Sequence, residues 1–203
     1  MIAFDANLAW CFFWTSYWFW GTLFTILSSR PIKRLNTVLI CVLKNMLVTW
    51  IGVNLIFLQP LRLCTHYSPW LKLLLCIILA ETWFYHIHIM LHQRQLFHLF
   101  HAQHHEFKHP YALTGIYCSS YEAFVCNLLS VSLGPSLTDL TGAWLYFWVI
   151  LAGFNVTLAH SGFGLSVFGY TLINSSHDLH HSNTNFNYGT LDVWDNIYST
   201  FRN

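Results

Sequence analysis

Charged residues are scarce in this chain of 203 residues. Asp, Glu, Lys and Arg together make up 8% of it, whereas hydrophobic residues make up 55%. A soluble globular domain carries about 25% charged residues, so the composition excludes an ordinary soluble protein and predicts a membrane protein. The formal net charge is +1 with histidine neutral. Because such a chain has no basic field to attract phosphates, a nucleic-acid partner is excluded too.

Several metal and cofactor motifs are missing. The six cysteines form no Cys-x-x-Cys pair, so we expect packed thiols in place of a disulfide framework or a thiolate metal site. No dinucleotide or flavin fingerprint occurs, and the His-Glu-x-x-His motif of zinc hydrolases is absent. Electrons for any redox chemistry would therefore come from outside the chain. With eight Asp and Glu residues in all, a metal site would be built almost wholly of imidazole.

Long apolar segments are abundant. Residues 7–29, 37–58 and 69–92 each reach the roughly 20 residues that a helix needs to cross a bilayer. The first lacks the basic start of a cleaved signal, so we expect it to be retained. Two shorter apolar pieces flank "GPSLTDLTG" at 134–142 and predict a helical hairpin. The predicted fold is an all-α integral membrane protein with about four transmembrane or hairpin helices.

The short loop after the first span sets the predicted orientation. It carries Arg30, Lys33 and Arg34, and an excess of Lys and Arg in short loops marks the cytoplasmic side. Arg62 and Lys72, near the opposite loop, argue the other way.

No repeat or linker divides the chain, so we expect one membrane domain over residues 1–203. Its expected segments are transmembrane helices over 7–92, a first cytoplasmic histidine-rich segment over 93–121, the hairpin over 122–159 and a second histidine-rich segment over 160–203.

Histidine is plentiful where charge is not. Ten of the 13 histidines lie in three short stretches, including "HAQHH" at 101–105 and "HDLHH" at 177–181. Residues three and four apart share a helix face, so each stretch is predicted to supply half of a metal shell. A lone histidine on an apolar helix is more often a satisfied polar group than a ligand. Three clusters are different, because burying each imidazole costs free energy that a metal would offset.

The number of imidazoles favours two metal ions. A zinc site uses three or four protein ligands, and the three clusters offer at least eight. Iron, zinc, copper and nickel all accept neutral imidazole, so the spacing alone does not select the metal.

The three clusters resemble the eight-histidine motif of the fatty acid hydroxylase superfamily of membrane di-iron oxygenases, which includes sterol desaturases, 4-methylsterol oxidases and cholesterol 25-hydroxylases. "ETWFYHIH" at 81–88 is similar to the family's approach to its first ligand, and "HSGF" at 160–163 to its "HSGY". "NYG" at 187–189 and "WD" at 194–195 resemble the family's closing motif. The likeness runs from about residue 35 onward. It implies a cytoplasmic histidine-rich helical cap that holds a di-metal site.

The resemblance implies nine metal ligands, with His160 as an addition to the eight: His88, His92, His101, His104, His105, His160, His177, His180 and His181.

Other positions depart from the family pattern. His86 stands where the family has an aromatic residue, which leaves its role open, and Ser199 replaces a glycine. His98 and His109 match no ligand position, and His66 lies in the opposite loop.

The implied function is hydroxylation or oxidation of a lipid C–H bond, with a sterol as the favoured substrate. The family uses two iron ions, for which another metal can substitute in purified protein, together with O2 and electrons from a cytochrome b5 type donor and its reductase. The implied location is the endoplasmic reticulum membrane, with a multi-pass chain and the metal site facing the cytoplasm. Asp178, Glu106 and Asp195 are candidates to orient the imidazoles, the alternative for each being a solvated charge.

Alternatives remain at this stage. A fatty acid hydroxylase or a sterol desaturase of the same superfamily would use the same ligands. A metal transporter would place its ligands along a path at mid-membrane depth, often beside acidic residues. An inactive scaffold would have no chemical reason to keep all the imidazoles.

Overall fold

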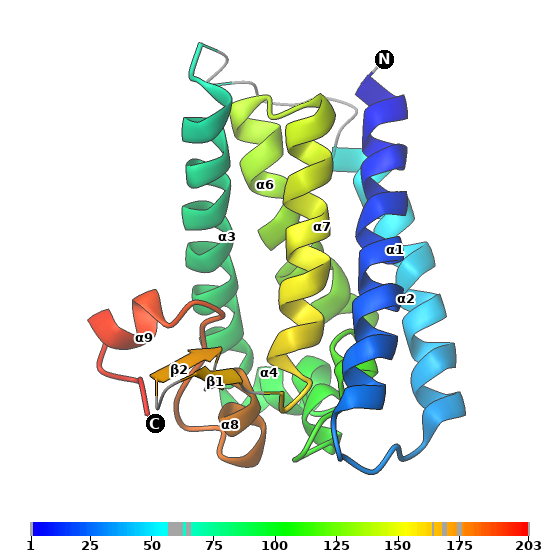
Figure 1. Ribbon diagram of the computed structural model, residues 1–203, viewed down its shortest axis with the longest axis vertical. Helices are drawn as coiled ribbons and strands as arrows, with labels where there is room; N and C mark the ends of the chain where they lie inside the picture. The colour runs from blue at the N-terminus through cyan, green and yellow to red at the C-terminus, as the bar shows by residue number, and fades with distance from the viewer. Residues whose placement is uncertain are drawn as a thin grey trace.

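The computed structural model describes most of the chain. Its described residues are 2–56, 63, 66–163, 165–167, 170–173 and 176–202. Long helices stand side by side, and short elements gather at the end opposite the N-terminus (Figure 1). The expected all-α membrane fold with a histidine-rich cap is therefore confirmed, with one small β-hairpin added to it.

The long helices agree closely with the predicted spans. They are α1 (Ile2–Leu27), α2 (Leu35–Ile56), α3 (Pro69–Leu91) and α7 (Gly142–Ala159). Within the described residues, α2, α3 and α7 are long and apolar enough to cross a membrane. The 26 residues of α1 give it a length of about 39 Å, and it runs beside α7 (Figure 1). The last two residues of the predicted 37–58 span lie outside the described residues.

Short elements form the cap and the first arm of the hairpin. The arm comprises α5 (Ser120–Glu122), the π-helical η4 (Ala123–Leu128) and α6 (Leu129–Thr138). The cap comprises α4 (Arg94–Leu96), the π-helical η1 (Phe97–His101), the 3-10 turns η2 (His104–Glu106) and η3 (Ala112–Thr114), the antiparallel strands β1 (Leu165–Val167) and β2 (Tyr170–Ile173), α8 (Ser176–Ser182) and α9 (Val193–Ile197).

The break in the hairpin lies later than the Gly-Pro pair that suggested it. Helix α6 continues through Pro135 and ends at Thr138, and Asp139 then takes a left-handed conformation with φ of 56°. A proline within a helix frees the carbonyl four residues before it. Here that carbonyl belongs to Val131, and the indole N–H of Trp148 donates to it at 2.8 Å. The neighbouring helix α7 thus satisfies the group that proline leaves unpaired, and the helix continues.

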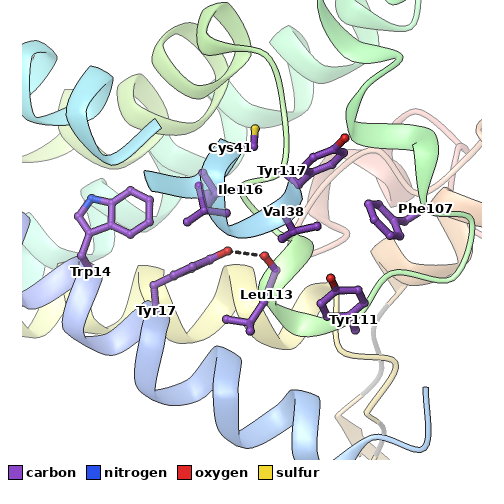
Figure 2. Packing of buried hydrophobic residues seen from close by; sticks show 10 residues of the cluster. Trp14, Tyr17, Val38, Cys41, Phe107, Tyr111, Leu113, Ile116 and Tyr117 are labelled. Carbon is purple, nitrogen blue, oxygen red and sulfur yellow. Dashed lines mark hydrogen bonds between the residues drawn. The ribbon is translucent and has the colours of Figure 1, made fainter. Parts of the chain in front are cut away.

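An aromatic cluster fixes α1 and α2 to the loop that precedes the hairpin (Figure 2). Trp14 and Tyr17 of α1 pack edge to face, with ring centroids 5.1 Å apart. The Tyr17 hydroxyl donates to the carbonyl of Leu113 at 2.7 Å. Phe107 and Tyr117 of the loop pack with their centroids 5.3 Å apart. This cluster holds the segment that follows the first histidine motif in place.

Helices α3 and α6 pack closely at Gly134, and this contact yields a stability prediction. A Cβ atom there would lie 2.7 Å from the Cα of Cys76. This is a backbone atom, so it cannot move away without a shift of the helix. A Cβ at Gly21 would lie 2.8 Å from the end of the flexible Leu113 side chain and in ordinary contact, at 3.4 Å, with the Thr157 methyl group. We expect Gly134→Ala to destabilise the fold by about 1–3 kcal/mol, as overpacking does. Thermal unfolding in detergent should show a clear loss for this variant and little change for Gly21→Ala.

Candidate metal centre

The nine predicted ligands come together at the cap end of the helices. They form two groups, in each of which one ligand atom per residue lies within 4.8 Å of all the others. Group A contains five histidines and group B four. Group A comprises His88, His92, His101, His105 and His180, and group B comprises His104, His160, His177 and His181.

The two HxxHH motifs divide between the groups, which differs from the prediction that each cluster would share one face. His101 and His105 enter group A and His104 enters group B, whereas the second motif gives only His180 to group A. In both motifs the first histidine joins the one four residues later, and the histidine three residues later joins the other group. The first motif combines a π-helical turn that ends at His101 with a 3-10 turn that begins at His104, whereas the second lies in the α-helix α8, so the same division occurs with and without regular α-helical geometry. The two groups therefore lie side by side with shared chain segments.

Backbone carbonyls fix the orientation of four of the rings. A carbonyl oxygen only accepts hydrogen bonds, so each Nδ1 that contacts one carries the proton. Nδ1 of His88 lies 2.6 Å from the Tyr188 oxygen, and Nδ1 of His180 lies 2.7 Å from the Phe186 oxygen. His160 and His181 donate in the same way to Val156 and Phe107, at 2.8 and 3.1 Å. In each ring Nε2 is left with a lone pair for a metal.

The spacing of the Nε2 atoms fits a shared cation. In group A, Nε2 of His101 lies 3.0 Å from Nε2 of His88 and of His92. Nε2 of His180 lies 2.9 Å from Nε2 of His92. Ligands at about 2.1 Å from one ion, at right angles to each other, are about 3.0 Å apart. Lone pairs aimed at one another at this distance repel unless a positive charge lies among them, so the residues present fit bound metal ions.

Orphaned ring nitrogens support the same interpretation of group B. Both ring nitrogens of His177 and Nε2 of His181 are buried without a hydrogen-bond partner in the described part of the chain. Nε2 of His104 and Nε2 of His160 approach to 3.2 Å. Buried polar atoms are almost always satisfied, and a metal ion would satisfy these.

Burial keeps the imidazoles neutral. It lowers the pKa of His160 from 6.5 to about 4, although the Val156 carbonyl and the charge of Asp178 oppose the shift. Burial and then neighbouring imidazoles lower the pKa of His104, His177 and His181 well below the usual value. Neutral imidazole is the form that binds a metal, so the site is prepared for it at neutral pH.

These shifts predict a loss of stability in acid. The unfolded chain takes up protons as the pH falls below 6.5, while the folded chain resists them down to a lower pKa, so folding is penalised over that interval. For His160 the interval is 6.5 to about 4, and its cost at pH 4 is of order 3 kcal/mol. The thermal midpoint of metal-free protein should be flat above pH 7 and fall steadily below 6.5. A midpoint that rises on acidification would contradict neutral buried rings.

The three acidic residues expected to orient the imidazoles contact other groups in the described structure. Asp178 pairs with Arg30, whose Nη2 lies 2.6 Å from Oδ2. Glu106 pairs with Arg34 and accepts from the Tyr117 hydroxyl. These ion pairs tie the cap to the connection between α1 and α2, so the basic loop and the histidines lie at the same end of the molecule.

The third of these residues, Asp195, acts on a loop. Its carboxylate accepts from the backbone N–H groups of Tyr188 and Gly189, at 2.9 and 2.6 Å. Because the carbonyl of Tyr188 accepts from His88, Asp195 supports this ring only through the loop.

The remaining histidines lie outside both groups. His86 is exposed, and its Nδ1 contacts the Thr82 carbonyl one helical turn earlier at 2.7 Å. His66, His98 and His109 are exposed. The sequence left the role of His86 open, and the structure places its side chain outside both groups.

Two buried carboxylates lie near the centre: Glu81, which begins the "ETWFYHIH" motif, and Glu122, to which the sequence assigned no role at the site. Oε2 of Glu81 in α3 accepts from the backbone N–H groups of Thr190 and Leu191, at 3.0 and 3.1 Å, and so holds the closing loop against the helix. Oε2 of Glu122 lies 2.9 Å from Nδ1 of His101. An acidic residue within an apolar segment was the available signal, because such residues are costly to bury.

An apolar cavity leads from the histidines into the helical bundle. It has a volume of about 320 Å³. At one end it is lined by His88, His104, His160 and His177, and along α7 it reaches Leu145. The distance from Leu145 to His160 along the helix is about 22 Å. An elongated apolar cavity that ends at a metal-binding cluster is suited to a lipid.

The family comparison bears on residues 73–200, which match the model of the fatty acid hydroxylase family. The chain belongs to this family. The match contains all nine clustered histidines and the two buried carboxylates, so the resemblance noted in the sequence is confirmed.

Curated relatives extend the comparison. The chain is 26% identical to fatty acid hydroxylase ahd1 of Mycosarcoma maydis over 176 residues, which is 84% of this chain and 44% of that protein. It is 29% identical to the sphingolipid C4-hydroxylase SUR2 of Saccharomyces cerevisiae, over 64% of this chain and 40% of that protein. It is 28% identical to methylsterol monooxygenase 1 of Danio rerio, over 62% of this chain and 45% of that protein.

The fatty acid hydroxylase relatives are longer than this chain, which spans less than half the length of each of these three. No solved structure matches.

Proposed function

We propose that this chain is the catalytic core of a membrane di-iron lipid oxygenase. The observation that carries the proposal is the meeting of the two histidine groups with the apolar cavity. The nine clustered histidines would hold the irons, five at group A and four at group B. Bound iron would supply activation of O2 and oxidation of an unactivated C–H bond, chemistry that no side chain of the cavity provides.

The residues of the chain would bind and orient the lipid. Trp148, Ala152 and Ala159 follow one face of α7 along the cavity, and Phe13 lines it from α1. These side chains would hold an apolar body and exclude water from the histidine end. Of the two groups, group B contributes three cavity-lining rings and group A contributes one, so the oxidised carbon would lie nearest group B.

We propose a sterol as the first substrate class to test, with an acyl lipid as the alternative. The methylsterol monooxygenase relative supports the sterol, and the fatty acid and sphingolipid hydroxylase relatives support the acyl lipid. The apolar lining of the cavity suits both.

The donor and location follow from the same proposal. The sequence carries no nucleotide motif, so we propose an external cytochrome b5 type donor with its reductase. We further propose the endoplasmic reticulum membrane, with the centre facing the cytoplasm. The position of Arg30 and Arg34 at the histidine end supports this orientation.

A combined assay of metal and product tests the proposal. The full chain is purified in detergent, loaded with Fe(II), and incubated with donor, reductase, 18O2 and a panel of sterols and acyl lipids. We expect two irons per chain and one labelled oxygen atom in a single lipid class. Iron binding without labelled product from any lipid would count against the oxygenase, and uptake of metal into vesicles would favour a transporter.

A further inference from the structure

Among the described residues, the Oε2 atom of Glu122 approaches one polar group, a ring nitrogen of His101. The side chain of Glu122 is 4% exposed and lies 2.9 Å from Nδ1 of His101, through Oε2. Neither atom has a formed hydrogen bond to another group in the described residues. The ring N–H is not aligned with Oε2, so the contact is a close approach at ion-pair distance.

This contact differs from those of the other clustered rings. Where Nδ1 of another ring has a formed bond in the described structure, as in His88, His160, His180 and His181, the partner is a backbone carbonyl. His101 is the one ring of the nine that faces a carboxylate among the described residues. A carboxylate behind a ligating imidazole fixes its tautomer and makes it a stronger metal ligand than a carbonyl does.

The local backbone places the two residues together. Glu122 directly precedes the π-helical η4, and His101 ends the π-helical η1. The hydroxyl of Ser119 donates to the carbonyl of Phe100 at 2.7 Å and accepts from the N–H of Glu122 at 3.1 Å. One serine thus ties the residue before His101 to the backbone of Glu122, so the carboxylate and the ring have a defined separation.

We propose that Glu122 is a positioning residue that accepts the Nδ1–H of His101 and thereby strengthens metal binding at group A. This inference rests on the proposed metal centre and adds that its two groups bind metal with different affinity. Group A has a carboxylate behind one ring, whereas the rings of group B have none in the described structure. The two ions are therefore held with different strength, and Glu122 determines part of the difference.

Cobalt binding tests the proposal without turnover. The full chain is titrated with Co(II) alone, and visible absorption and equilibrium dialysis report each ion. We expect two ions in the wild type. In Glu122→Leu one of them should bind about 10–100-fold more weakly, and Glu122→Gln, which keeps a neutral acceptor, should fall between. The spectrum of the ion that remains in Glu122→Leu should match that of His105→Ala, a group A variant.

Cys126→Ala controls for altered packing, because Cys126 is buried four residues later on the same arm and belongs to neither histidine group. It should retain both cobalt affinities. Unchanged affinities in Glu122→Leu would overturn the proposal. Equal losses of cobalt affinity in Glu122→Leu, Glu122→Gln and Cys126→Ala would also overturn it, since these would show a structural effect. A wild type that binds fewer than two ions would instead refute the proposed di-metal function itself.

Discussion

His160→Ala is expected to weaken the binding of one metal ion at least about 100-fold and to reduce lipid turnover to a similar extent. The ring ends α7, and its Nε2 lies 3.2 Å from Nε2 of His104 within group B. Losing a residue that only positions a ligand costs about 10–100-fold in affinity or activity, and a direct ligand should cost no less. Group B has four members, so three would remain to hold the ion.

The matched control is His86→Ala. His86 is exposed and contacts the backbone of its own helix, so this variant should keep both ions and normal turnover. Metal analysis and product formation are measured on the same preparations. Full activity of His160→Ala would remove His160 from the ligand set and leave the eight histidines of the three clusters.

Ala152→Trp is expected to lower kcat/KM for the lipid about 100-fold without loss of metal. Ala152 lines the cavity on α7 between Trp148 and the histidine end, so an indole would occupy the space that we assign to the substrate. A displacement of about 1 Å at the reacting carbon already costs about 100-fold. The product assay and the iron content of the variant would be measured together.

Ile150→Trp serves as the comparison for Ala152→Trp. Ile150 lies on the same helix, but its side chain is exposed and does not line the cavity. An indole there should leave kcat/KM within about twofold of the wild type, because it adds volume outside the proposed lipid path. Normal turnover of Ala152→Trp would show that the lipid reaches the centre by another route.

Much of the fold could be predicted because it follows from apolar length. The predicted start of the third span at residue 69 is the first residue of α3, and its predicted end at 92 lies one residue beyond Leu91. The end of α6 could not be predicted in this way. It depends on the Trp148 indole, which satisfies the Val131 carbonyl that Pro135 leaves free. A tertiary contact of this kind has no local signature in the sequence.

The histidine site could be predicted in its membership and less well in its arrangement. All nine expected residues meet in the two groups. Their division was not predicted, because the shared helix face groups residues three and four apart together, whereas in both motifs the histidine three residues after the first joins the other group. The carboxylate facing His101 was also missed, because Glu122 is 21 residues away along the chain and was interpreted as the start of the hairpin.

The division of the histidine motifs between the groups has a consequence for biosynthesis. Group A needs His180, and group B needs His177 and His181, so neither set is complete until α8 has left the ribosome. The ion pair of Asp178 with Arg30 assists the docking of α8. Arg30 is synthesised much earlier than Asp178. Complete metal loading would thus follow the synthesis of α8, and a nascent chain stalled before α8 would expose unpaired imidazoles to the cellular metal pool.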